Sequence, residues 1–228
     1  LNITYNRNLS KALTSTTMAG YQIQYNRRQY AAQDGRDLAP FGKTIAAANN
    51  LFNRPVQSIS ERFISGAFIQ QTFGWKEQVF ITLAGRIDKS SVFAEDNQNN
   101  FYPKVSGSWV LSDYIKNKDL ISSAKLRAAY GQAGNLTGIG AYDRFDNYLL
   151  SSIGGLASIT PSTTFANPSV RPEKMTEFEF GGDFAFLKNR LSLSVNVYSQ
   201  KITDLLLTKP VPPSVGGTSI VTNVGDNT

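Results

Sequence analysis

The sequence predicts an all-β protein whose antiparallel strands form a segment of a transmembrane β-barrel wall. Three observations support this fold class. Apolar and polar residues alternate in segment after segment, short turns alternate with long connections, and aromatic residues gather near the strand ends. Period-two alternation indicates strands with two different faces. The other two features are typical of barrels in the outer membrane.

The bulk composition excludes several kinds of site. The 228 residues include no Cys and no His, which removes thiol chemistry, disulfides and imidazole-ligated metal. The net charge of +6 comes from dispersed Lys and Arg, whereas a nucleic-acid surface would show a denser basic stripe. No apolar run of about 18 residues is present, so we expect no transmembrane helix.

About five strands are expected in the first half of the chain. They are residues 1–5, 13 to about 30, 61–73, 78–88 and 101–111. Tight turns are expected near 7–10 and 74–77. Residues 31–58 are polar and small, and they contain two prolines, so we interpret them as a long loop with a helical turn at "IAAANNLF".

Four more strands are expected in the second half, at residues 124–131, 177–186, 190–199 and 218–224. A moderate connection, residues 112–123, has room for one helical turn. Residues 135–174 are rich in Gly, Ser and Thr and are interpreted as a loop of about forty residues, and residues 208–217 as another loop. Several of these strands reach the roughly 9–11 residues that cross a bilayer at a tilt.

The stretch "EFEFGGDFAF" shows why the two faces of the sheet matter. Phe178, Phe180, Phe184 and Phe186 share one parity, and acidic residues occupy the other. The charges expected on that second face are Glu177, Glu179, Asp183, Arg86, Asp88, Lys125 and Arg127. A wet lumen accepts such charges, whereas a dry core penalises each unpaired one by several kcal/mol. The pattern alone also fits a large antiparallel sheet with one solvated face.

Several ordered blocks of the sequence resemble the SusC/RagA-like branch of TonB-dependent outer-membrane transporters. "NPSVRPEKMTEFEFGG" is similar to a family segment that reads Asn-Pro-x-Leu-x-Pro-Glu followed by Glu-x-Gly. The matching positions are Asn167, Pro168, Pro172, Glu173 and Glu177, while Val170 replaces the commoner Leu and Phe180 intervenes before Gly181. "LISSAKLRAAYGQAGN", "GAFIQQTFGWKEQVFITLAGRIDKSSVF", "FYPKVSGSWVLSDY" and "DLLLTKPVPPSVGGTSIVTNVG" resemble further blocks. The likeness covers residues 60–225 well.

The resemblance implies a location in the bacterial outer membrane and a role in import of oligosaccharides or peptides. It implies a barrel of about 22 strands around an N-terminal plug. Residues 1–228 would then be part of one barrel domain, without the plug and without the C-terminal strands. The implied partners are a SusD-like surface lipoprotein and, through the missing N-terminal region, the TonB–ExbB–ExbD complex. No cofactor is implied.

Two alternatives remain open from the sequence. One is a soluble extracellular β-sandwich that binds glycans as an adhesin. The other is a siderophore or cobalamin receptor of the same superfamily, against which the branch-specific blocks argue.

The longest expected loop supplies a candidate substrate-binding set in "YDRFDNY": Tyr142, Asp143, Phe145, Asp146, Asn147 and Tyr148. Aromatic rings beside carboxylates and amides suit sugar rings, which have an apolar face and polar edges. The alternative is that the loop folds on these rings to cap the barrel. Asn167, Pro168, Pro172, Glu173 and Glu177 are expected to be structural, because proline favours extended re-entry into a strand.

No catalytic or metal site is expected. The sequence shows no nucleophile beside a base, and "AEDNQNN" lacks the Gly and the terminal Glu of a calcium loop. Glu177 and Glu179 lie two apart on one strand, about 7 Å between their Cα atoms. That spacing could suit glycosidase chemistry, but charges lining a wall explain it more simply. We therefore expect no enzyme activity.

Overall fold

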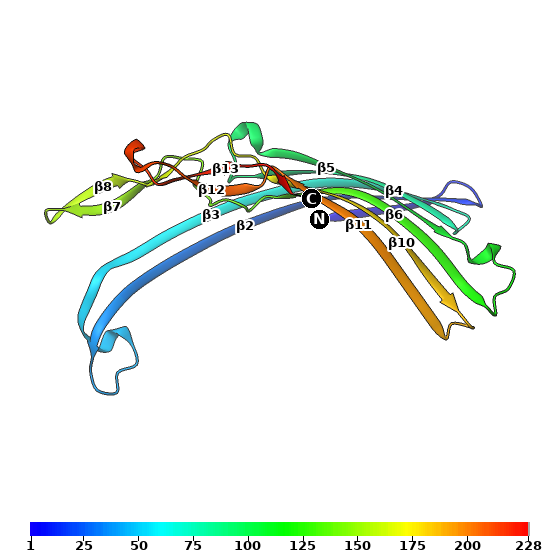
Figure 1. Cartoon of the computed structure of the whole chain (residues 1–228), viewed down its shortest axis with the longest axis horizontal. Helices are drawn as coiled ribbons and strands as arrows, with labels where there is room; N and C mark the ends of the chain where they lie inside the picture. Colours follow the sequence, from blue (N-terminus) through cyan, green and yellow to red (C-terminus); the bar gives the residue numbers. More distant parts are fainter. Residues whose placement is uncertain (228) are drawn as a thin grey trace.

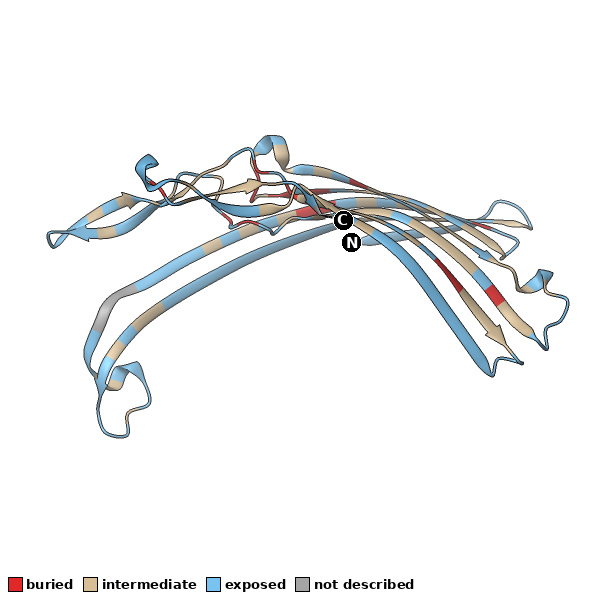
Figure 2. Cartoon of the chain, viewed as in Figure 1, coloured by how far each residue is buried: buried red, intermediate tan, exposed pale blue. Residues whose placement is uncertain are grey.

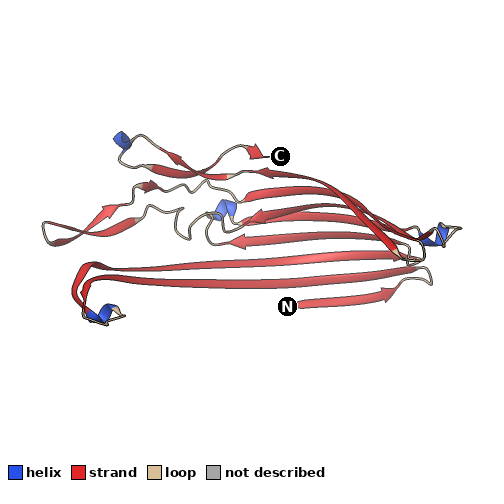
Figure 3. Ribbon diagram, turned by 60° about the horizontal axis from the view of Figure 1, so that its bottom comes forward, coloured by secondary structure: helices blue, strands red, loops and turns tan. Residues whose placement is uncertain are grey.

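The computed structural model describes residues 1–227, apart from the side chains of residues 52–55 and 227. It confirms the all-β architecture. One open nine-stranded antiparallel sheet, here called the wall, carries two small sheets at one end (Figures 1 and 3). In spatial order the wall strands are β1 (Asn2–Asn8), β2 (Leu13–Leu38), β3 (Ala48–Trp75), β4 (Val79–Ser90), β5 (Asn99–Val110), β6 (Ile121–Asn135), β10 (Glu173–Phe186), β11 (Leu191–Thr203) and β14 (Asp226–Asn227). Within the described residues, no helix is long and apolar enough to cross a membrane.

Consecutive wall strands are joined at two opposite ends. At the turn end the connections are residues 9–12, 76–78, 111–120 and 187–190. At the loop end they are residues 39–47, 91–98, 136–172 and 204–225. Figure 3 shows the turns on the right and the loops on the left. The alternation of short and long connections is confirmed for the two longest loops, 136–172 and 204–225, whereas 39–47 and 91–98 are no longer than the turn-end connection 111–120. The helical turn expected within 112–123 is the 3₁₀ turn Ser112–Tyr114.

The prediction of a long loop at residues 31–58 is wrong. β2 continues to Leu38 and β3 begins at Ala48, so the true connection is short and contains a 3₁₀ turn at Ile45–Ala47. The two strands form a ribbon that reaches past the rest of the wall (Figure 1). A register shift between Ala32 and Asp34 marks a bulge in this ribbon. The described side chains of the ribbon are largely exposed on both of its faces. Apolar and polar residues therefore do not alternate along it, and its sequence does not indicate strands.

The forty-residue loop is also more regular than expected. It contains the hairpin β7 (Tyr148–Ile153) and β8 (Leu156–Pro161) and the short strand β9 (Thr164–Phe165). The segment 218–224, expected as the ninth wall strand, instead contributes β13 (Ser219–Asn223). This strand pairs with β12 (Leu206–Pro210) and, in parallel, with β9. The ninth wall strand is the short β14, which pairs with β11.

The register places the two parities of every wall strand on opposite faces. Leu83, Val105, Tyr130 and Phe178 form one continuous row across β4, β5, β6 and β10. They are 46%, 46%, 38% and 53% exposed, although all four are large apolar or aromatic residues. The neighbouring row, Thr82, Ser106, Ala129 and Glu179, lies on the other face. One face of the wall is therefore apolar and the other polar.

No second layer covers the apolar face within the part of the chain that the structure describes. Buried residues are few, and most of the larger ones lie in the loops (Figure 2). A soluble sandwich would bury these side chains between two sheets. The sandwich alternative is therefore wrong, and the exposed apolar face is the surface that a barrel presents to lipid.

Two aromatic residues on the polar face lie close against glycines. Gly20 is paired with Phe68, and a Cβ added at Gly20 would collide with the Phe68 ring. The same holds for Gly134 and the ring of Tyr102. These glycines let large rings pack along the wall, because a side chain in their place would push each ring outward.

Candidate functional site

The polar face of the wall is hollowed along its loop end. Three adjoining hollows of about 290, 300 and 320 Å³ run across the strands from β2 to β10. The first two share Arg86 and Gly134, and the second and third share Lys104, Gln132 and Ala133. We call this continuous depression the rim groove. Its lining mixes small and apolar residues with amide, hydroxyl and charged side chains.

An ion pair between the partly exposed Arg86 and the buried Asp88 forms the floor between the first two hollows. Arg86 Nε donates to Asp88 Oδ2 at 2.8 Å and lies 2.7 Å from Oδ1. The Asp88 side chain is only 8% exposed. The close approach of Arg86 to Oδ1 is not a hydrogen bond, and no other described residue donates one to this oxygen. Gly66 makes room for the pair, since a Cβ there would collide with both partners. The guanidinium therefore compensates a carboxylate that water hardly reaches.

The third hollow lies over Gly131, with unlike charges on its two sides. Lys104 on β5 and Glu177 on β10 are both paired in register with Gly131. Glu179 completes this hollow, and no ion pair recorded for the described residues includes either glutamate. The register confirms that Glu177 and Glu179 share the polar face.

Two of the charges expected farther down this face, Arg127 and Asp183, are paired with each other. Arg127 bonds Asp183 and also donates to Asn196 Oδ1. Ser194 donates to the other oxygen of Asp183 at 2.7 Å. This network spans β6, β10 and β11 and leaves the carboxylate of Asp183 compensated.

The loops above the rim groove share a small apolar core. Val92, Phe93, Ile139 and Val170 are nearly or fully buried together. Leu136, Leu206 and Val221 pack against them. Three separate loop-end connections therefore form one packed unit.

The candidate set in residues 142–148 divides into anchors and exposed rings. Asp143 accepts a hydrogen bond from the Gly140 amide at 2.8 Å, and Asn147 donates to the Tyr142 carbonyl at 3.0 Å. These two side chains brace the loop from within. Tyr142, Phe145 and Tyr148 are 42%, 49% and 64% exposed, and Asp146 is exposed.

Two of these rings border a separate hollow of about 260 Å³. Tyr142 and Phe145 line it together with Arg144, whose guanidinium carbon lies 4.3 Å from the centre of the Phe145 ring. Tyr142 Oη also accepts a hydrogen bond from the Glu61 amide at 3.3 Å, which ties the loop to β3. Tyr148 lies at the start of β7 and does not line this hollow.

The motif at 167–173 ties the loop-end connections together. Asn167 donates to the Val221 carbonyl at 2.8 Å and accepts from the Ser169 amide. Arg171 bonds Asp204 at 2.8 Å. Pro168 and Pro172 flank these contacts, and the segment 166–172 between β9 and β10 has no strand of its own. This geometry fits a structural motif.

Glu173 is the central acceptor of this motif. Its two carboxylate oxygens accept from Asn135 Nδ2 at 2.8 Å and from the Leu206 amide at 2.9 Å. The carboxylate thereby joins the end of β6 to the start of β12.

We expect Glu173→Ala to loosen the loop unit without unfolding the wall. Leaving the Leu206 amide unsatisfied should cost about 1–2 kcal/mol locally, so that amide should exchange its hydrogen roughly tenfold faster or more. Hydrogen exchange of the full-length protein measures this. Glu95→Ala is the matched control, because Glu95 is exposed and its carboxylate forms no recorded contact. Equal exchange in the two variants would contradict the role of Glu173.

Sequence reasoning missed the rim groove as a site. The alternation placed Arg86 and Asp88 on the polar face. It did not indicate that these two residues would line hollows together with Tyr102 and Lys104. The available signal was that polar residues of one parity occur near the loop end of several successive strands. Among the described residues, no group of three or more acidic side chains lies together as a metal site would require.

Comparisons with known proteins agree with this geometry. A family model described as TonB dependent receptor-like, β-barrel, matches residues 1–228. TonB-dependent receptor P26 of Formosa agariphila is 33% identical over 205 residues, which is 81% of this chain and 20% of that protein. TonB-dependent receptor SusC of Bacteroides thetaiotaomicron is 27% identical over 139 residues, or 58% of this chain and 14% of that one.

Solved structures show the same fold. The RagAB peptide transporter superposes with a TM-score of 0.87 at 22% identity, covering 99% of this chain and 25% of that one. The siderophore receptor PirA from Pseudomonas aeruginosa gives 0.52 at 13% identity, covering 99% of this chain and 43% of that one. The chain thus spans about a fifth of the length of the first curated relative and a quarter of the RagAB chain. It belongs to the TonB-dependent receptor-like β-barrel family and forms part of the barrel wall.

Proposed function

We propose that this chain is the wall and loop segment of an outer-membrane transporter that imports oligosaccharides or peptides. The observation that carries the proposal is the rim groove, which lies on the polar face directly below the packed loops. The opposite face is apolar and exposed, as contact with lipid requires. Import of this kind is binding followed by gated passage and needs no covalent chemistry.

The proposal includes two partners of the complete protein. A SusD-like surface lipoprotein would cover the loop end, and the TonB–ExbB–ExbD complex would act through the N-terminal region. The names of the relatives support TonB dependence, and the RagAB transporter is described as a peptide transporter. The β7–β8 hairpin supports a covering partner, because Leu150 and Leu156 are 93% and 75% exposed on it.

Gene deletion and complementation test the transport function. Cells that lack the full-length transporter should lose uptake of one labelled class, oligosaccharide or peptide, and regain it with the intact gene. A siderophore or cobalamin cargo is the alternative outcome, and the lower structural agreement with PirA gives it less support. Unchanged uptake of both oligosaccharides and peptides would overturn the proposal.

We expect the exposed rings of residues 142–148 to contribute to cargo binding. In the full-length transporter, Phe145→Ala with Tyr148→Ala should lower uptake about tenfold at limiting cargo, because each ring contributes about 0.5–1.5 kcal/mol to a stacked contact. Uptake per folded barrel in the outer membrane is the measurement.

The matched control is Phe41→Ala, which removes a fully exposed ring at the tip of the β2–β3 ribbon. Its uptake should equal that of the unmodified protein. If the double variant also transports normally, the rings serve only to cap the barrel, and the binding hypothesis for this set is wrong.

A further inference from the structure

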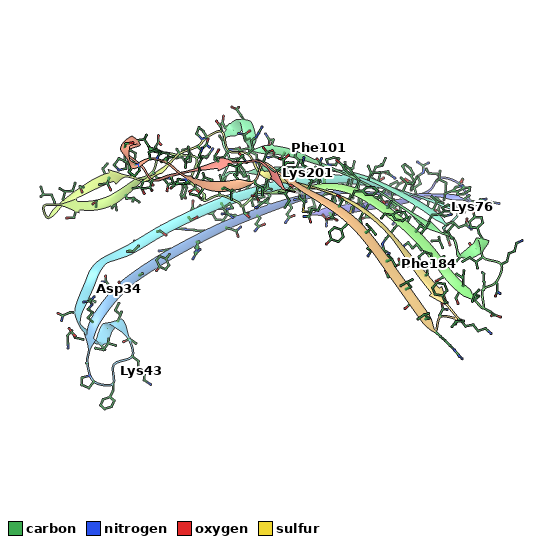
Figure 4. The ribbon with its side chains drawn as sticks, viewed as in Figure 1. Asp34, Lys43, Lys76, Phe101, Phe184 and Lys201 are labelled. Atoms are coloured by element: carbon green, nitrogen blue, oxygen red, sulfur yellow. The ribbon has the colours of Figure 1, made fainter. Side chains whose placement is uncertain are left out.

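Basic residues are concentrated at the turn end of the wall. The four turn-end connections contain six basic residues (Lys11, Lys76, Lys116, Lys118, Lys188 and Arg190) and three acidic ones (Glu77, Asp113 and Asp119). The four loop-end connections contain four basic and five acidic residues. Among the connections, the excess of positive charge is therefore confined to the turn end. Figure 4 shows Lys76 at that end and Lys43 at the far end of the ribbon.

A row of tryptophans marks the level where the apolar face meets this charge. Trp75, Val79 and Trp109 are paired in register across β3, β4 and β5. Both tryptophans are 45% exposed, and Tyr114 packs edge-on against Trp109 with ring centres 6.2 Å apart. Exposed Trp and Tyr at this position are typical of the boundary between hydrocarbon and headgroups.

The ammonium groups lie immediately beyond this boundary. Lys76 Nζ stands 4.7 Å from the centre of the Trp75 ring. Among the ion pairs recorded for the described residues, none includes Lys11, Lys76, Lys116 or Lys118. These exposed cations therefore remain available to an outside anion.

We propose that the turn end binds the phosphate groups of anionic phospholipids in the bilayer leaflet that it faces. Charge complementarity and continuity with the lipid-facing apolar surface both favour this occupant over a protein partner. Lys76 over Trp75 forms the best-defined position, with an aromatic ring at headgroup level and a cation beyond it.

The test counts lipids bound to the full-length transporter. The purified protein is offered equal amounts of phosphatidylglycerol and phosphatidylcholine in mild detergent, and native mass spectrometry reports which is retained. The unmodified protein should prefer phosphatidylglycerol. In the variant K76Q/K116Q/K118Q, the ratio of retained phosphatidylglycerol to retained phosphatidylcholine should fall about tenfold or more. The variant K43Q/K89Q/K209Q makes the same charge change at the loop end and should keep the preference for phosphatidylglycerol.

Either of two results would overturn the proposal. One is a turn-end variant that retains phosphatidylglycerol as well as the unmodified protein. The other is an equal loss in both variants, which would show a response to total charge alone. The heat-dependent shift of the barrel band on a gel confirms that each variant is folded before lipids are counted.

Discussion

Replacing Arg86 with methionine is expected to destabilise the folded protein by about 3 kcal/mol. The change leaves the Asp88 carboxylate, whose side chain is 8% exposed, without the guanidinium that lies within hydrogen-bonding distance of both oxygens. Tyr102 and Gly66 also lie around this carboxylate, and neither supplies a charge to replace Arg86. Equilibrium urea unfolding of the full-length protein in lipid vesicles, followed by Trp fluorescence, measures the difference.

Two further variants separate loss of the pair from loss of packing. The double change Arg86→Met with Asp88→Leu removes both charges and should recover most of the stability, since an apolar pair of similar volume is often no worse than a buried ion pair. Arg171→Met breaks the exposed pair with Asp204, whose side chains are 60% and 32% exposed, and should cost less than about 1 kcal/mol. If Arg86→Met costs no more than Arg171→Met, the pair does not stabilise the wall.

The wall could be predicted from the sequence because its surroundings differ on the two faces. In a barrel wall, lipid on one side and a wet lumen on the other force each strand to alternate, and the alternation then fixes the register. The row Leu83, Val105, Tyr130 and Phe178 is the direct result. The same reasoning correctly assigned Glu177 and Glu179 to the polar face.

Elements outside the membrane carry no such signal. The β2–β3 ribbon is exposed on both faces, so residues 31–38 show the small polar composition of a loop although they form a strand. Backbone hydrogen bonds within the ribbon, not burial, define it. The hairpin β7–β8 has apolar residues on both faces, which again gives no alternation.

The loop unit could not be predicted because its contacts join distant parts of the sequence. The core brings together Val92, Ile139 and Val170, and Asn167 reaches the Val221 carbonyl. Nothing in the local pattern of any one loop indicates these partners. The division of residues 142–148 into bracing side chains and exposed rings likewise depends on the positions of Gly140 and Glu61.

A charge on the apolar face should be far more damaging than the same charge one residue away. Val105 lies near the middle of β5 and is 46% exposed on the apolar face, so Val105→Arg should destabilise the barrel in a bilayer by about 2–4 kcal/mol. Ser106 points to the polar face, where Ser106→Arg should cost about 1 kcal/mol or less, because a wet lumen solvates the guanidinium.

The comparison of these two variants tests the orientation of the wall directly. Both add the same side chain to the same strand, so the change in net charge is the same in the two variants. Urea unfolding in vesicles gives the free energy of unfolding of each variant, and the heat-dependent shift of the barrel band on a gel gives the folded fraction. Equal destabilisation would mean that the two faces meet similar surroundings, and the apolar face would then not be the surface that contacts lipid.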